Sequence, residues 1–270
     1  MQLKIVTWNM HNQIKAFDYV KSEFIVKKDI DIILLQEVRN LLKDHPSLFD
    51  YLKEKKYQIF YSDHSLNGYW NIAILVKESL IHKSLGKTVD ILTGKPRKTK
   101  AGERCSTWWM CYEFVLSNNQ KMTIINIYAN PSYDVPYIFD STNDKYGYDK
   151  FREELEEKVK GRDKELVIMA GDLNIDDRWD EYHDDDPKSW NQSPAFEFLK
   201  KIGLVNCFKD YGKPIWTRFP WQNDHVFINK ELDEKSKIIE YNVFNDFSIA
   251  SEILMKYSDH VPLGVTLDFD

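Results

Sequence analysis

The chain has 270 residues, 43% of them hydrophobic, and carries 37 Lys and Arg against 43 Asp and Glu, which gives a net charge of −6. This composition is typical of a folded soluble protein and excludes a disordered chain, a collagen and a repeat array. Proteins that grip long duplex nucleic acid through its phosphates usually have a basic surface. The negative charge therefore argues against tight, sequence-independent binding of that kind.

No linker rich in Ser, Gly or Pro interrupts the chain, so we expect one domain over residues 1–270. Cys105, Cys111 and Cys207 are odd in number and lack a CxxC spacing, which indicates reduced cysteines that pack in the core. Residues 1–12 leave no room for the apolar segment of a signal peptide, and no run approaches the ~18 apolar residues of a membrane span. We expect a cytoplasmic monomer that does not contact membranes.

The apolar runs along the chain are short and rich in β-branched residues, which is typical of strands. They comprise residues 4–8, 30–35, 71–76, 123–128, 166–170 and 261–267. Because the runs are nearly continuous rather than alternating, we expect strands that are buried on both faces.

Two stretches interrupt this pattern and are expected to form loops. Residues 94–104 contain five Lys and Arg against one Glu, and residues 131–148 contain four tyrosines. A long ordered loop in a compact domain is more often functional than not. The basic stretch is most simply a solvated hairpin, and it is also a candidate local contact for nucleic acid.

Two charged segments have the pattern of helices. In residues 149–160 the apolar Phe151, Leu155 and Val159 are four residues apart and share one helical face. Residues 193–203 have a Ser at the capping position, a Pro in the first turn and a Gly at the exit. Strands interspersed with helices predict an α/β layered sandwich.

Acidic residues are expected to end the apolar strands, where a chain that continues a core would not place them. These residues are Glu37, Asp172, Asp224 and Asp259. A carboxylate beside a buried strand is costly unless it is paired, hydrogen-bonded or bound to a metal. We therefore expect the four carboxylates to share one polar site at one edge of the sheets.

Five motifs spread over the chain include three of these carboxylates, those of Glu37, Asp172 and Asp259. They are Thr7-Trp8-Asn9, Leu35-Gln36-Glu37, Asn126-Ile127-Tyr128, Gly171-Asp172-Leu173-Asn174 and Ser258-Asp259-His260. In this order they resemble the endonuclease/exonuclease/phosphatase superfamily, which contains exonuclease III-like abasic-site endonucleases, DNase I-like nucleases, sphingomyelinases and inositol-phosphate phosphatases. The resemblance implies a four-layered α/β/β/α sandwich of two packed mixed β-sheets flanked by helices, and divalent-metal-dependent cleavage of phosphate esters.

The resemblance also implies a metal site. Glu37 matches the metal carboxylate of the family, with Asn9 and Asp259 close to the ion or its water shell. Hard oxygen ligands of this kind suit Mg²⁺ or Mn²⁺ rather than zinc. His11 stands where abasic endonucleases tend to have a carboxylate, and it is either a neighbour of the metal ligands or a packed histidine.

The remaining site residues are expected to act on water and phosphate. Asp172 matches the residue that orients or deprotonates the attacking water, and Asn174 its phosphate-binding neighbour. His260 would donate to a phosphoryl oxygen or act as an acid, and Asp224 would fix its tautomer and charge. Tyr128 would donate a hydrogen bond to the phosphate. The residues before Asp224 lack the apolar residue common in the family, so the strand there is expected to start late.

Aromatic residues near the late motifs have two interpretations. Trp190, Trp216 and Trp221, with tyrosines of the 131–148 stretch, are candidates for a wall that stacks against a base or sugar. Packing in the core is the competing interpretation, and it is favoured for Trp216.

The leading hypothesis is a Mg²⁺- or Mn²⁺-dependent phosphodiesterase that hydrolyses nucleic acid, as a nuclease or a repair-type endonuclease or exonuclease. A second hypothesis is a phosphatase or phosphodiesterase that acts on a small or lipid-linked phosphate ester. A third is a non-catalytic binding module with the same fold. The retention of every acidic motif position argues against the third.

Overall fold

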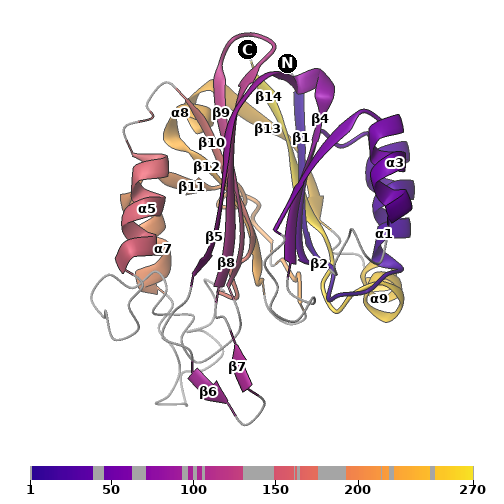
Figure 1. Ribbon diagram of the computed structural model, residues 1–270. Coiled ribbons are helices and arrows are strands. Elements are labelled where there is room, and N and C mark those ends of the chain that lie inside the picture. The colour runs from indigo at the N-terminus through magenta and orange to yellow at the C-terminus, as the bar shows by residue number, and fades with distance from the viewer. Residues whose placement is uncertain are drawn as a thin grey trace.

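The computed structural model describes residues 2–38, 46–62, 71–92, 97–99, 102–104, 107–129, 149–160, 162, 165–175, 193–213, 215–218, 222–243 and 247–269. Over these residues two six-stranded sheets lie face to face, and helices cover the outer face of each sheet (Figure 1). The four-layered arrangement that the motifs predict is therefore confirmed.

The first sheet has the strand order β13-β14-β1-β2-β4-β3. Its strands are β1 (Gln2–Asn9), β2 (Ile32–Val38), β3 (Tyr57–Tyr61), β4 (Asn71–Lys77), β13 (Ser236–Val243) and β14 (Leu263–Phe269). β1 and β2 are parallel and the other neighbours are antiparallel, so the sheet is mixed.

The second sheet has the order β11-β12-β10-β9-β8-β5. Its strands are β5 (Ile81–Leu92), β8 (Thr107–Leu116), β9 (Lys121–Ala129), β10 (Leu166–Asp172), β11 (Leu204–Asn206) and β12 (Asp224–Asn229). Only β9 and β10 run parallel. The basic stretch contributes a separate antiparallel pair, β6 (Arg97–Thr99) and β7 (Gly102–Arg104), which agrees with the predicted hairpin.

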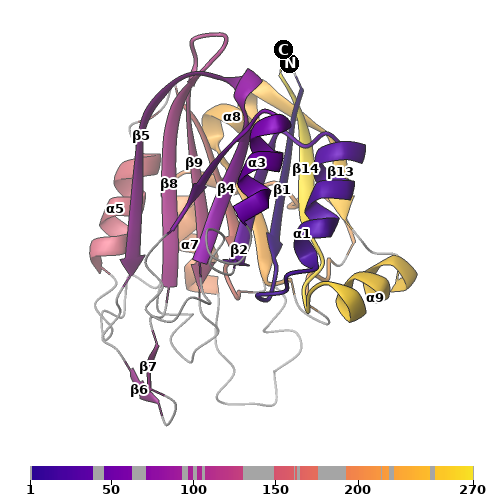
Figure 2. The ribbon, with the colours of Figure 1, turned by 45° about the vertical axis from the view of Figure 1, so that its right-hand side comes forward.

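The helices form the two outer layers (Figures 1 and 2). The first sheet is covered by α1 (Ala16–Tyr19) with the π-helical turn that follows it (Val20–Lys27), by α3 (Pro46–Glu54) and by α9 (Phe247–Lys256). The second is covered by α5 (Asp149–Val159) and α7 (Ser193–Lys201), the two helices predicted from the sequence. Short helices occupy Glu78–Leu80 and α8 (Lys230–Lys235).

The apolar core has three parts, one between the sheets and one under each helical layer. Residues of β2, β9 and β10 are buried on both faces, as the continuous apolar runs predict. Cys111 and Cys207 are buried free thiols, and burial raises the pKa of both. Cys105 and the 131–148 stretch lie outside the described residues. Within the described part of the chain, no helix is long and apolar enough to cross a membrane.

Candidate active site

The inner faces of the sheets change from apolar to polar along the strands. Every second residue of a strand points to the same face. On β10 the inward series is Leu166, Ile168 and Ala170, which lie in the core between the sheets, and the next member is Asp172. On β1 and β9 the inward series ends in the same way, at Asn9 and at Tyr128. On β12, which runs antiparallel to β10, the inward series begins at Asp224 and continues with Val226 and Ile228. Polar side chains from both sheets therefore meet at one edge of the sandwich.

Glu37 reaches this edge through a β-bulge in β2. The pairing of β2 with β4 shifts register between Leu35 and Val38, and Glu37 has a φ of +49°. In regular alternation Glu37 would point to the opposite face from Gln36, and the left-handed backbone turns it into the site. Its side chain is only 8% exposed.

The bulge is held by two buried amides that join the sheets. Asn126 Nδ2 donates to the carbonyl oxygens of Leu35 at 3.0 Å and Ala73 at 2.8 Å, which form the last regular pair of β2 and β4 before the bulge. Its Oδ1 accepts a hydrogen bond of 2.7 Å from Gln36 Nε2. Gln36 and Asn126 belong to the sequence motifs, but the sequence did not indicate this function.

Asn9 connects the carboxylates of the two sheets. Its fully buried Nδ2 donates to Glu37 Oε1 at 3.0 Å and to Asp172 Oδ2 at 2.8 Å, and its Oδ1 accepts from the backbone N–H of His11. One amide therefore sets the separation between the predicted metal carboxylate and the predicted water-orienting carboxylate.

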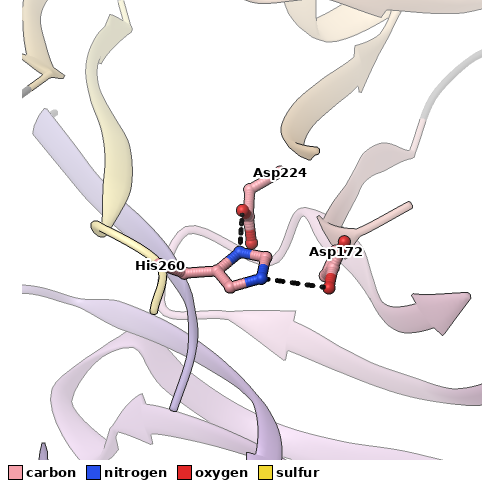
Figure 3. A group of neighbouring side chains, drawn as sticks. All are labelled: Asp172, Asp224 and His260. Carbon is pink, nitrogen blue, oxygen red and sulfur yellow. Dashed lines mark hydrogen bonds and ion pairs between the residues drawn. The ribbon is translucent and has the colours of Figure 1, made fainter. Parts of the chain in front are cut away.

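Asp224, His260 and Asp172 form a buried row (Figure 3). His260 Nδ1 lies 2.7 Å from Asp224 Oδ2, and its Nε2 lies 3.8 Å from Asp172 Oδ2. The first distance is that of a strong, charge-assisted hydrogen bond, whereas the second is too long for a direct one. Asp224 therefore fixes the ring, and Nε2 is directed toward Asp172.

The segment that carries His260 is anchored to β1. Ser258 Oγ donates to the carbonyl oxygen of Asn9 at 2.7 Å, and the backbone N–H of His260 donates back to Ser258 Oγ. Trp8 Nε1 donates to the carbonyl oxygen of His260 at 2.9 Å. These contacts connect residues about 250 positions apart in sequence and explain why the first and last motifs occur together.

The pKa values of His260 and Asp172 are both raised, but for different reasons. Burial lowers the pKa of His260, but the carboxylates of Asp224 and Asp172 outweigh it and raise the pKa overall. Burial raises the pKa of Asp172, and Asp224 and Glu37 add to this, while His260 and Asn9 oppose it. The arrangement therefore favours a protonated imidazole beside a carboxyl group with enhanced basicity.

Tyr128 and Asn174 flank Asp172. Burial, the charges of Glu37 and Asp172 and a hydrogen bond with Glu37 raise the pKa of Tyr128 well above its usual value, so the phenol stays protonated. Asn174 has a φ of +51°, and its backbone N–H donates to Asp172 Oδ1 at 3.0 Å. Its side chain donates to the carbonyl oxygen of Ala129 and accepts from Asn223 Nδ2.

Asp259 lies at the open rim of the site, with its side chain 35% exposed. Its Oδ1 is 3.2 Å from His11 Nδ1, which is also 3.6 Å from Glu37 Oε2. Its Oδ2 is 3.3 Å from an Nη of Arg218. His11 thus lies between two predicted metal ligands. The sequence did not single out Arg218, whose loop lacks a recognisable motif.

The donor set fits a hard divalent cation. Glu37, Asp259 and Asn9 offer carboxylate and amide oxygens, which are the ligands that Mg²⁺ and Mn²⁺ prefer, and a nearby imidazole is compatible with Mn²⁺. Asp259 Oδ1 is a buried atom that makes no hydrogen bond among the described residues, since its close contact with His11 Nδ1 is an ion-pair distance and not a hydrogen bond, and Asp224 Oδ1 likewise makes none. The Asp172, Asp224 and His260 row is a second possible metal cluster, but Asp224 already occupies His260 Nδ1.

Two expectations need correction. Asp224 and Asp259 do not end strands: Asp224 begins β12 and Asp259 precedes β14. They reach the same edge because β12 runs antiparallel to β10 and β14 antiparallel to β1. Trp216 is 36% exposed rather than packed in the core, because its neighbours Ile215 and Thr217 take the buried positions. Trp190 and Trp221 lie outside the described residues.

Solved structures share this fold at low sequence identity. D. rerio TDP2 complexed with a single-strand DNA product is 15% identical over 99% of each chain, with a TM-score of 0.61. An AP endonuclease from Archaeoglobus fulgidus is 17% identical over 99% of each chain, with a TM-score of 0.62. ANGEL2, a 2′,3′-cyclic phosphatase, is 13% identical over 99% of this chain and 95% of its own, with a TM-score of 0.66.

No curated protein matches the chain. The family model described as the Endonuclease/Exonuclease/phosphatase family matches residues 6–260, which include every motif from Asn9 to His260. The chain belongs to the endonuclease/exonuclease/phosphatase family and has its DNase I-like fold.

Proposed function

We propose that this protein is a Mg²⁺- or Mn²⁺-dependent phosphodiesterase that hydrolyses nucleic acid. The observation that carries the proposal is the buried row of Asp224, His260 and Asp172, joined through Asn9 to Glu37. Hydrolysis of a phosphodiester needs an activated water, a neutralising charge on the phosphoryl group and a proton donor. The residues of this edge supply each of these functions.

Glu37, Asn9 and Asp259 would hold the ion. When bound, a divalent cation polarises the phosphoryl group and stabilises the departing oxygen. Asp172 accepts a proton from the attacking water, since its raised pKa makes it a stronger base than an exposed aspartate. His260, kept protonated by Asp224, donates from Nε2 to a phosphoryl oxygen. Tyr128 stays a phenol and donates to the phosphate, while Asn174 positions Asp172.

The distance of 3.8 Å between His260 Nε2 and Asp172 Oδ2 supports separate roles for His260 as proton donor and Asp172 as proton acceptor. A direct hydrogen bond would tie the two groups to each other. The longer separation leaves the two groups without a direct hydrogen bond to each other, so that each can contact a phosphoryl oxygen or a water bound beside them.

Activity on a panel of substrates tests the proposal. The panel contains supercoiled plasmid, a single-stranded oligonucleotide, a duplex with an abasic site, an inositol phosphate, sphingomyelin and an aryl phosphodiester, each with Mg²⁺, Mn²⁺ or EDTA. We expect metal-dependent cleavage of nucleic acid that EDTA abolishes. Asp172→Asn and His260→Ala should each lower kcat roughly 10²- to 10⁴-fold.

Matched surface variants control for the loss of one charge or one imidazole. Asp50→Asn on α3 and His82→Ala on β5 change exposed residues and should leave kcat unchanged. Circular dichroism checks that the site variants fold. Wild-type cleavage at full rate in EDTA, or full activity of Asp172→Asn, would exclude the proposal.

A small phosphate ester is the second candidate substrate. The net charge of −6 favours it, because an acidic surface weakens the non-specific attraction to long polyanions. ANGEL2, which has this fold, is described as a 2′,3′-cyclic phosphatase. Turnover of the small substrates alone would select this candidate. If no substrate is turned over and millimolar Mn²⁺ does not bind, the protein is a binding module.

A further inference from the structure

The loop of residues 215–218 borders the site and exposes two side chains, of which Arg218 contacts Asp259 at the rim. Ile215 is 3% exposed and Thr217 is 1% exposed, whereas Trp216 is 36% exposed and the Arg218 side chain is 43% exposed. Exposure therefore alternates, so that Trp216 and Arg218 face solvent while the residues before each of them anchor the loop in the core.

Thr217 fixes this loop against the catalytic segments. Its Oγ1 accepts hydrogen bonds from the backbone N–H groups of Asn223 and Asp224, both at 3.0 Å. Its carbonyl oxygen accepts a 2.8 Å hydrogen bond from the N–H of Val261. The loop is thus tied both to the first residue of β12 and to the residue after His260.

Arg218 brings positive charge to an acidic rim. It pairs with Asp259 Oδ2 at 3.3 Å, and it is close enough to Tyr128 to oppose the rise of that pKa. Because Arg218 and Asp259 are both partly exposed, their ion pair is weak, and Arg218 can exchange this partner for another anion at little cost.

We propose that Arg218 binds a phosphate of the substrate and that Trp216 packs against the adjoining base, so that this loop recognises a nucleotide unit. The inference rests on the proposed function and deepens it. The planar guanidinium matches two phosphate oxygens, and an exposed tryptophan provides a stacking surface for any base. The contact with Trp216 would allow the site to distinguish a nucleotide from a phosphate ester that has no base.

The proposal predicts opposite effects of Arg218 on metal and on nucleotide. A divalent ion held by Asp259 would compete with Arg218 for this carboxylate, and Arg218 would then be free to bind the phosphate. Removal of the guanidinium should then tighten Mn²⁺ binding in the absence of nucleotide and weaken nucleotide binding in the presence of Mn²⁺. A residue that served only to hold the loop in place would weaken both when removed.

Isothermal titration measures both quantities without catalysis. Mn²⁺ is titrated into the full chain, and then thymidine 5′-monophosphate or 2-deoxyribose 5-phosphate is titrated into the Mn²⁺-loaded protein. We expect Arg218→Ala to raise the Kd of both phosphates roughly 10- to 100-fold. Arg218→Lys should recover part of the affinity. Trp216→Ala should weaken only the nucleotide, and Trp216→Phe should retain most of its binding.

Lys213→Ala removes an exposed positive charge just before this loop and serves as the control for net charge. Equal losses of phosphate affinity in Lys213→Ala and Arg218→Ala, or a Mn²⁺ Kd that rises in Arg218→Ala, would overturn the proposal. An equal loss of affinity for the two phosphates in Trp216→Ala would refute the proposed contact between Trp216 and the base. Because binding is read without turnover, these failures are separate from failure of the proposed hydrolysis, which the wild-type substrate panel alone decides.

Discussion

At the scale of single residues, the site depends on a glycine that has no chemistry of its own. Gly171 precedes Asp172, has a φ of +147° and packs against β9 so closely that a Cβ would lie 1.9 Å from the carbonyl oxygen of Ile127. Gly171 and Ile127 are paired through their backbones in neighbouring strands. A methyl group at Gly171 could therefore be accommodated only if β10 shifted away from β9, and this shift would move Asp172.

We therefore expect Gly171→Ala to destabilise the protein by more than about 3 kcal/mol, because the methyl group meets backbone that cannot yield. Gly212→Ala is the matched control, since Gly212 also has a positive φ of +72° but has open space at its Cβ. It should cost only about 1 kcal/mol of backbone strain. Urea unfolding gives both free energies, and similar losses in the two variants would refute the steric explanation.

At the scale of elements, the bulge of β2 determines the position of Glu37. The strand itself was predictable, because residues 30–35 form a continuous apolar run. The bulge was not, because it depends on the Asn126 amide, which reaches carbonyl oxygens 91 and 53 positions away. β1, β4, β9, β10 and β14 were predicted for the same reason as β2. β8 was not, because its apolar residues are mainly aromatic and sulfur-containing rather than β-branched, and Glu113 interrupts them.

Asn126→Ala tests whether the amide holds the bulge. It leaves two buried carbonyl oxygens and the Gln36 side chain without their partner, so we expect a loss of about 2–3 kcal/mol in the free energy of unfolding. Because Glu37 then loses its fixed position, Mn²⁺ affinity should fall as well. Asn118→Ala, in the exposed turn between β8 and β9, should leave Mn²⁺ affinity unchanged and lower the free energy of unfolding by no more than about 1 kcal/mol, since it removes only an exposed hydrogen bond from the Gln120 N–H. Unaltered Mn²⁺ affinity in Asn126→Ala would show that the amide does not determine the position of Glu37.

On the outer face of the second sheet, an ion network joins β8 to α5 and to the segment before β10. Glu113 Oε1 lies 2.6 Å from Arg162 and 3.2 Å from Lys158. Burial raises the pKa of Glu113, but Arg162 and Lys158 outweigh this and lower it below its usual 4.5. A lowered folded-state pKa means that Glu113 stabilises the fold above the unfolded-state pKa, and that this contribution disappears as the pH falls through the folded-state pKa.

Glu113→Gln should accordingly be less stable than the wild type at pH 7, by less than about 1 kcal/mol because the network is partly exposed. The difference should shrink as the pH falls below 4.5. Urea midpoints of both proteins between pH 7 and pH 3 check this, with Glu54→Gln, an exposed residue of α3, as the control. A difference that stayed constant with pH would mean that charge is not the cause.

At the scale of the whole molecule, the site joins the two halves of the sandwich. Asn9 and Glu37 come from the first sheet, Tyr128, Asp172 and Asp224 from the second. The motifs predicted which residues would meet, because the direction in which a strand runs decides which of its ends lies at the shared edge. They did not predict Arg218 or Thr217, whose importance comes from packing against segments far away in sequence. An ion held by Glu37, Asn9 and Asp259 would stabilise the folded molecule, because the unfolded chain does not keep these distant ligands together.

We expect Mn²⁺ at about 100 times its Kd to raise the Tm of the wild type by roughly 5 °C. Glu37→Gln should abolish this shift. It should not lower the Tm of the metal-free protein much, since it removes one of several neighbouring negative charges and keeps an oxygen for Asn9 Nδ2. Differential scanning calorimetry with Mn²⁺ or EDTA measures each value, and Asp50→Asn should behave as the wild type.

A second variant locates the ion within the site. Asp224→Asn changes the row of Asp172, Asp224 and His260 but leaves Glu37, Asn9 and Asp259 intact. If the ion binds at Glu37 and Asp259, the Mn²⁺-induced rise in Tm persists in Asp224→Asn and is lost in Glu37→Gln. The reverse result would place the ion in the buried row, where Asp224 would have to give up its 2.7 Å hydrogen bond to His260, and would contradict the assignment of that row to proton transfer.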